Sequence, residues 1–140
     1  MTTHLVLPDV QFRDGDNTEF LTHIGEYIVE KKPTRLICLG DFADMPSLSS
    51  YDVGKKSFEG RRYKKDIDAA NAAMEVLLKP INDYNNKARR NHKPLYTPSM
   101  DFTLGNHEDR ITRAVEGDPK LDGTISVDDL QFAKHGWPVS

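Results

Sequence analysis

One short pattern occurs three times in this chain of 140 residues and limits the folds that it can adopt. Each copy places Asp or Asn two positions after a Leu, with Pro or Gly between them. A short apolar or β-branched stretch precedes each copy, which is typical of a buried strand that ends in a turn. We therefore predict three strands, which end at Val6-Leu7-Pro8-Asp9, Cys38-Leu39-Gly40-Asp41 and Thr103-Leu104-Gly105-Asn106.

Helical patterns separate the predicted strands. Apolar residues recur at helical spacing from Phe20 to Ile28, with Asn17 or Thr18 as the N-cap and Pro33 beyond the end. A second apolar stripe predicts a helix over about residues 65–85. Pro80 should kink or restart that helix, because proline has no backbone donor.

Two further helices are predicted after the third strand. One should begin near His107 and end before Asp118-Pro119. The pattern Ser126-Val127-Asp128-Asp129 resembles a capping box, so it should open a last short helix that Gly136 stops.

This order of elements favours an α/β fold. Strands that alternate with helices imply right-handed crossovers and a mainly parallel sheet with helices on both faces. A length of 140 residues with 37% hydrophobic side chains suits a single domain, and no linker marks a boundary. In such sheets the functional crevice lies beyond the carboxyl ends of the strands, where Asp9, Asp41 and Asn106 fall.

Composition argues against several classes of protein. No apolar run approaches the roughly 18 residues of a membrane helix, and no signal-peptide pattern opens the sequence. The single cysteine, Cys38, excludes an intrachain disulfide and a cysteine-based zinc site. Because Cys38 lies in an apolar run, we expect a reduced, buried thiol in a soluble, cytoplasmic protein.

Charge is unevenly distributed, although the net charge is only −3. Residues 54–94 hold 11 Lys or Arg against 5 Asp or Glu, which would allow this segment to approach phosphates or nucleic acid. The alternative is that residues 54–94 form a loop and a helix face whose charged side chains are simply solvated. Aromatic residues alternate with the cations that could follow a phosphate backbone, namely Lys55, Lys56, Arg61, Arg62, Lys64 and Lys65.

Seven polar residues follow the three predicted strands and should converge at one edge of the sheet. Their carboxylate and amide oxygens suit Mg²⁺ or Mn²⁺, and the imidazole extends the choice to Fe and Zn. Without a cation, clustered carboxylates would repel one another and raise each other's pKa values. The seven residues are Asp9, Gln11, Asp41, Asp44, Asn106, His107 and Glu108.

These residues resemble the blocks D-x-H, G-D-x-x-D and G-N-H-E/D of the calcineurin-like metallophosphoesterases. The ordered match covers roughly the first 115 residues, and Met45–Lys65 with the helix after it resembles bacteriophage-encoded members. The resemblance implies the N-terminal half of the family's β-sandwich fold in one domain, 1–140, with a basic loop and helix insertion at about 45–95. The matching segments are Asp9-x-Gln11, Gly40-Asp41-x-x-Asp44 and Gly105-Asn106-His107-Glu108.

The resemblance implies a metal-dependent hydrolase of phosphodiesters or phosphomonoesters, including those of nucleic acids or nucleotides. Asp41 would bridge two ions, Asp9 and Gln11 would bind one of them, and Asn106 the other. His107 would contact the phosphate and assist the leaving group. Mn²⁺ is the expected ion, with Mg²⁺, Fe²⁺ and Zn²⁺ as alternatives, while Asp44 would support its turn.

Two departures from the family pattern modify this expectation. Gln11 stands where the family has His, and the family's downstream His and G-H-x-H blocks are missing. We therefore expect one firmly bound ion, slow hydrolysis, and an uncovered sheet edge or apolar face that favours a homo-oligomer. The alternative is a catalytically weak or inactive metal-binding module that binds a protein partner or nucleic acid.

Overall fold

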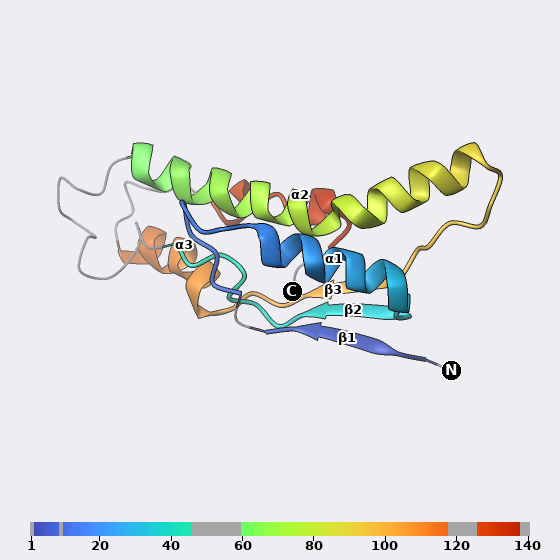
Figure 1. Cartoon of the computed structure of the whole chain (residues 1–140). Coiled ribbons are helices and arrows are strands. Elements are labelled where there is room, and N and C mark those ends of the chain that lie inside the picture. Colours follow the sequence, from blue (N-terminus) through green and yellow to red (C-terminus); the bar gives the residue numbers. More distant parts are fainter. Residues whose placement is uncertain (1, 9, 46–59, 118–125, 138–140) are drawn as a thin grey trace.

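The structure is a computed structural model that describes residues 2–8, 10–45, 60–117 and 126–137 (Figure 1). Of these residues, the side chains of Arg61, Arg62, Asn106, His107 and Ala114 are not described. The described part contains a sheet, three α-helices and two short 3₁₀-helices.

Three short strands form a parallel sheet in the order β1-β2-β3. The strands are β1 (His4–Leu7), β2 (Arg35–Cys38) and β3 (Ser99–Phe102). Leu7 pairs with Cys38 and Cys38 with Phe102, so these three buried side chains stand side by side on one face. The predicted α/β class with a parallel sheet is confirmed.

Helix α1 (Glu19–Lys31) has the predicted ends. The Asn17 side chain accepts a hydrogen bond from the backbone N–H of Glu19 at 2.8 Å. At the other end Lys32 adopts the left-handed conformation, φ 47°, directly before Pro33. Leu21 and Ile28 are fully buried on the inner side of this helix.

Helix α2 (Gly60–Arg90) is longer than predicted and continues through Pro80, so of the two predicted effects of Pro80 the restart does not occur and the kink remains. Its axis bends along the way (Figure 1). A Cβ atom on Gly25 of α1 would lie 2.9 Å from the ring of Pro80 and would clash with the Leu77 carbonyl. Because Gly25 has no side chain, the two helices can pack at close range.

In the described part of the chain, no helix combines the length and apolarity needed to cross a membrane.

Both crossover helices pack on the same side of the sheet (Figure 1), so the expectation of helices on both faces is wrong for the described residues. The physical reason is the strand order, because two right-handed crossovers between successive neighbours place both helices on one face. On the other face Val6 is 45% exposed and Ile37 is partly exposed. The same face also carries Arg35 and Asp101, which form an ion pair at 3.6 Å, so it is mixed in character. The uncovered apolar face and self-association stay predictions.

The chain continues after β3 with α3 (Asn106–Gly117), as predicted, and then with two 3₁₀-helices, η3 (Val127–Asp129) and η4 (Ala133–His135). The capping box between Ser126 and Asp129 is confirmed, and Gly136 ends η4 with φ 96°. Phe132 and Trp137 pack on Phe102, with ring centroids 4.7 and 6.2 Å away. The C-terminal segment therefore closes the core over β3.

Candidate active site at the carboxyl ends of the strands

The segments that follow β1 and β2 run side by side beyond the sheet. The backbone N–H of Gln11 donates to the Asp41 carbonyl at 2.6 Å, and that of Phe12 donates to the Phe42 carbonyl at 2.7 Å. The N–H of Asp44 returns a bond to the Phe12 carbonyl at 2.9 Å. The first two blocks of the predicted site are therefore held together by backbone hydrogen bonds.

Two glycines bring the second and third blocks into contact. Gly40 has φ 92°, and a Cβ atom there would lie 2.6 Å from the Thr103 carbonyl and would clash with Gly105. A Cβ atom on Gly105 would in turn clash with the amide and the carboxylate of Asp41. The Asp41 carboxylate thus lies against Gly105, immediately before the first turn of α3.

Glu108 ties these segments together from the first turn of α3. Its side chain is fully buried and accepts three backbone hydrogen bonds, from Asp41 at 2.6 Å, from Ala43 at 2.7 Å and from Gly105 at 2.9 Å. The bond from Gly105 is the half of a capping box that a Glu at the third helical position supplies. The other two bonds fix the segment that carries Asp41.

The sequence prediction gave Glu108 no such role. A usable signal was present, because Glu stands three positions after Gly105 at a strand-to-helix junction. That signal predicts the bond within the turn only. The bonds to Asp41 and Ala43 span 67 and 65 residues and depend on the tertiary fold.

Burial strongly affects the titratable groups behind the site. Desolvation raises the pKa of Glu108, and the nearby charge of Asp41 raises it further, while the three backbone N–H groups oppose the shift. Burial also raises the pKa of Cys38 to about 12, which keeps this thiol protonated. The predicted buried cysteine is confirmed.

Asp44 occupies a supporting position. Its carboxylate is buried and forms an ion pair with Arg13 at 2.9 Å. The guanidinium of Arg110 donates to the Asp44 carbonyl at 2.8 Å, which links this loop to α3. These contacts suit the predicted role of Asp44 in supporting its turn.

A backbone hydrogen bond joins Gln11 and Asp41, the two members of the predicted ligand set whose side chains are described. Gln11 is exposed with φ 49°, and Asp41 is partly buried with φ 52°. Asn106 and His107 begin α3 directly after Gly105, the residue that Asp41 contacts, and their side chains are not described. Asp9 lies outside the described residues.

The donor atoms at this edge suit a hard divalent ion. The Asp41 carboxylate and the Gln11 amide offer oxygens, which such ions prefer. Among the described side chains, which include neither Asp9 nor His107, no three of His, Cys, Asp or Glu group as a metal site.

The predicted phosphate-contacting cations are only partly described. Lys55 and Lys56 lie outside the described residues, as do the side chains of Arg61 and Arg62. Lys64 and Lys65 are exposed in the N-terminal part of α2, and Lys64 forms an ion pair with Asp68 at 3.1 Å. That pair favours the solvated helix face for Lys64.

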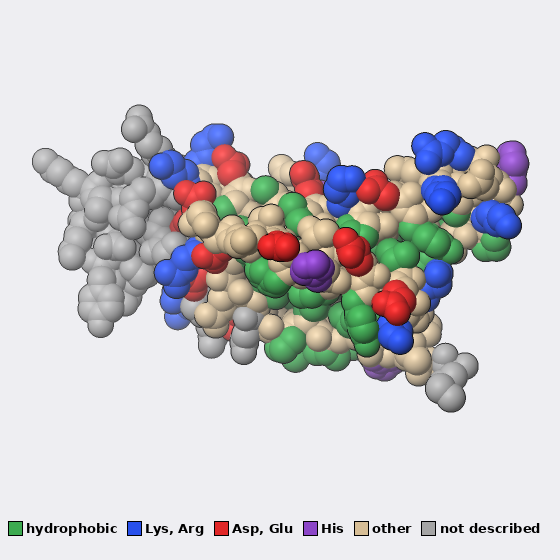
Figure 2. All heavy atoms as spheres, in the orientation of Figure 1, with side chains coloured by type: hydrophobic (Ala, Val, Ile, Leu, Met, Phe, Trp, Pro, Cys, Tyr) green, Lys and Arg blue, Asp and Glu red, His purple; other side chains and the backbone are tan. Residues whose placement is uncertain are grey.

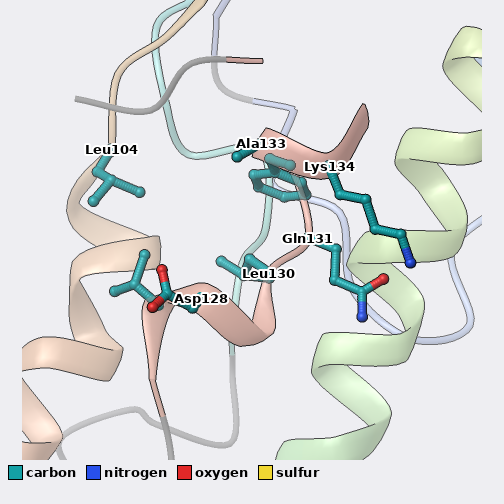
Figure 3. Close-up of a pocket in the computed structure, with 8 residues that line it drawn as sticks. Leu104, Asp128, Leu130, Gln131, Ala133 and Lys134 are labelled. Atoms are coloured by element: carbon teal, nitrogen blue, oxygen red, sulfur yellow. The ribbon is translucent and has the colours of Figure 1, made fainter. Parts of the chain in front are cut away.

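A hollow of about 330 Å³ flanks the candidate site. Leu104, which directly precedes Gly105, lines one side of it, and the C-terminal segment lines the other (Figure 3). The lining is mostly apolar, and its polar members are Asp128, Gln131 and Lys134. The sequence prediction missed this hollow because it forms only where the segment 127–134 folds back to Leu104, which is distant in the chain.

Comparison with known proteins adds no assignment. A scan against family models, a search of curated proteins and a search of solved structures each gave no match.

Proposed function

We propose that the chain is a metal-dependent phosphoesterase that hydrolyses a phosphodiester or phosphomonoester bond, with a fold like the N-terminal half of the metallophosphoesterase sandwich. The observation that carries this proposal is the contact between Asp41 and Gly105, which joins the second block to the third. Gln11 joins the same cluster through its bond to the Asp41 carbonyl. One residue from each of the three sequence blocks, namely Gln11, Asp41 and Gly105, therefore belongs to this cluster of contacts.

Each residue has a defined role in this proposal. Asp9, Gln11, Asp41 and Asn106 hold the divalent ion, for which Mn²⁺ is the proposed identity. The chemistry supplied by the bound ion is polarisation of the phosphoryl oxygen and activation of water. The backbone N–H groups at the start of α3 favour the negative charge of the phosphate. His107, protonated, donates its proton to the departing alkoxide.

The neutral Gln11 amide limits the proposed activity. An amide oxygen replaces the imidazole that the resembling family carries at this position, which weakens one ion position. We therefore propose one firmly bound ion per chain and slow turnover.

Two measurements test the proposal. Adding Mn²⁺ to chelator-stripped protein should raise the melting temperature, because an ion that binds only the native state stabilises it. The loaded protein should hydrolyse bis-p-nitrophenyl phosphate, and His107→Ala should abolish hydrolysis while the shift in melting temperature remains. His23→Ala, at an exposed position on α1, is the matched control and should retain activity.

The outcomes separate the candidate functions. A shift in melting temperature without hydrolysis would favour the metal-binding interaction module. No shift with any divalent ion and no hydrolysis would refute both functions.

A further inference from the structure

The end of the molecule opposite the candidate site carries an unusual concentration of positive charge. It is formed by the C-terminal ends of α1 and α2 and the segment that follows α2 (Figures 1 and 2). From Tyr84 to Tyr96 the sequence contains no Asp or Glu, and Glu30 is the one acidic residue in the last turn of α1. We call this surface the basic end and define it by its six exposed cations, Lys31, Lys32, Lys87, Arg89, Arg90 and Lys93.

Specific contacts hold the parts of the basic end in place. The Lys32 ammonium lies 4.6 Å from the centre of the Tyr84 ring, which joins α1 to α2. The Tyr96 hydroxyl donates to the Pro33 carbonyl at 2.6 Å, and the Tyr96 backbone N–H donates to the Asn85 side chain at 2.8 Å. The two helix ends and the following segment therefore form one fixed surface.

The cations of the basic end differ from other described Lys and Arg side chains in their ion pairing. Arg13, Lys64 and Lys79 form ion pairs at 2.9, 3.1 and 2.7 Å. None of the six cations of the basic end pairs with a carboxylate among the residues that the structure describes. The helix dipole favours cations in a last turn, but it does not account for the lack of acidic partners.

A hollow of about 290 Å³ opens within this surface. It is lined by Tyr84, Lys87, Ala88, Asn91 and Lys93. An aromatic ring and an amide between two lysines suit a nucleotide base whose neighbouring phosphates contact the lysines.

We propose that the basic end binds single-stranded nucleic acid, with its phosphates on the exposed cations and a base in the hollow beside Tyr84. A single strand fits better than a duplex, because only an unstacked base can enter the hollow. An anionic membrane fits less well, since Leu95 is the one large apolar side chain that is exposed between α2 and β3.

This surface is distinct from the proposed active site. The 31 residues of α2 span about 46 Å, and the candidate site lies beyond the carboxyl ends of the strands at the other end of the molecule (Figure 1). Binding at the basic end is therefore a second property of the chain, and it can be tested without a divalent ion.

Fluorescence anisotropy with a labelled strand of about 20 nucleotides, in the presence of a chelator, tests the proposal. Neutralising two cations in Lys87→Gln/Lys93→Gln should raise Kd about tenfold and lower the slope of log Kd against log salt by about 1.4. The control Lys79→Gln/Lys134→Gln removes the same charge elsewhere and should change Kd less than about twofold. Thermal melts should show that all variants are folded.

A second variant tests the hollow itself. Tyr84→Leu keeps apolar bulk but removes the aromatic face, so it should raise Kd for the single strand about fivefold or more. Equal loss of binding in the control pair, or no binding by the unmodified chain at low salt, would overturn the proposal. A duplex that binds as tightly as the single strand would overturn the placement of a base beside Tyr84.

Discussion

The two ends of the molecule are built in opposite ways. At the carboxyl ends of the strands, the buried Glu108 carboxylate fixes two loops through three backbone hydrogen bonds. At the basic end, exposed cations stand on helix termini, and the surface is fixed from behind by Tyr84 and Tyr96. The comparison indicates that substitutions at the first end should change stability and ion binding, whereas those at the second should change mainly the binding of a polyanion.

The largest expected loss of stability comes from Glu108→Gln. Glutamine has one acceptor oxygen, so at least one of the three N–H groups loses its acceptor and faces an amide N–H₂ instead. We expect a loss of about 3 kcal/mol in the free energy of unfolding, measured by urea denaturation. Glu116→Gln changes an exposed residue on the same helix and should cost less than about 0.5 kcal/mol. Equal losses in the two variants would contradict the proposed role of Glu108.

The next largest difference in stability is expected between alanine substitutions at two glycines. Gly40 and Gly15 have nearly the same backbone angle, φ 92° and 90°, but nothing lies within 4 Å of a Cβ atom built on Gly15. Gly40→Ala adds a clash with Thr103 and Gly105 to the conformational strain. It should cost about 3 kcal/mol, against about 1 kcal/mol for Gly15→Ala. Similar melting temperatures for both variants would show that the two loops are not packed as described.

Tyr96→Phe should have a smaller effect at the other end. It removes the hydroxyl that donates to the Pro33 carbonyl at 2.6 Å. The expected cost is about 1 kcal/mol, which is typical of one hydrogen bond. Tyr27→Phe, at a side chain that is 50% exposed, is the control and should leave the urea midpoint unchanged. A cost as large as that of Glu108→Gln would break the contrast between the two ends.

The smallest expected effect near neutral pH concerns Cys38. Because burial raises its pKa from 9.0 to about 12, the folded state keeps the neutral thiol while the unfolded state ionises at lower pH. Its contribution to stability is therefore complete below pH 9 and is lost as the pH rises towards 12. At pH 8 a thiol reagent should react only after unfolding. Rapid reaction of the native protein would contradict this burial.

Much of the fold could be predicted from local patterns. The repeated strand-and-turn pattern located all three strands, and the spacing from Phe20 to Ile28 located α1. These features depend on neighbouring residues, as does the capping box at Ser126. The single covered face of the sheet could not be predicted in this way, because it follows from the order in which the strands pair.

The candidate site was only partly predictable for the same reason. The sequence placed Gln11, Asp41 and the start of α3 at strand ends, and the structure brings these parts together. It did not indicate that Glu108 would hold Asp41 and Ala43, which are distant in the chain. The length of α2 was also underestimated, because the helix extends at both ends beyond the apolar stripe that predicted it.

The most direct test of the proposed metal site is a calorimetric titration of chelator-stripped protein with Mn²⁺, comparing the unmodified chain with Asp41→Asn. We expect one firmly bound ion per chain, and loss of that binding in the variant, because Asp41 is the proposed central ligand. Without metal, Asp41→Asn should melt at a slightly higher temperature, since the charge of Asp41 repels that of buried Glu108. Equal Mn²⁺ affinity in the two proteins, or no binding by either, would contradict the account.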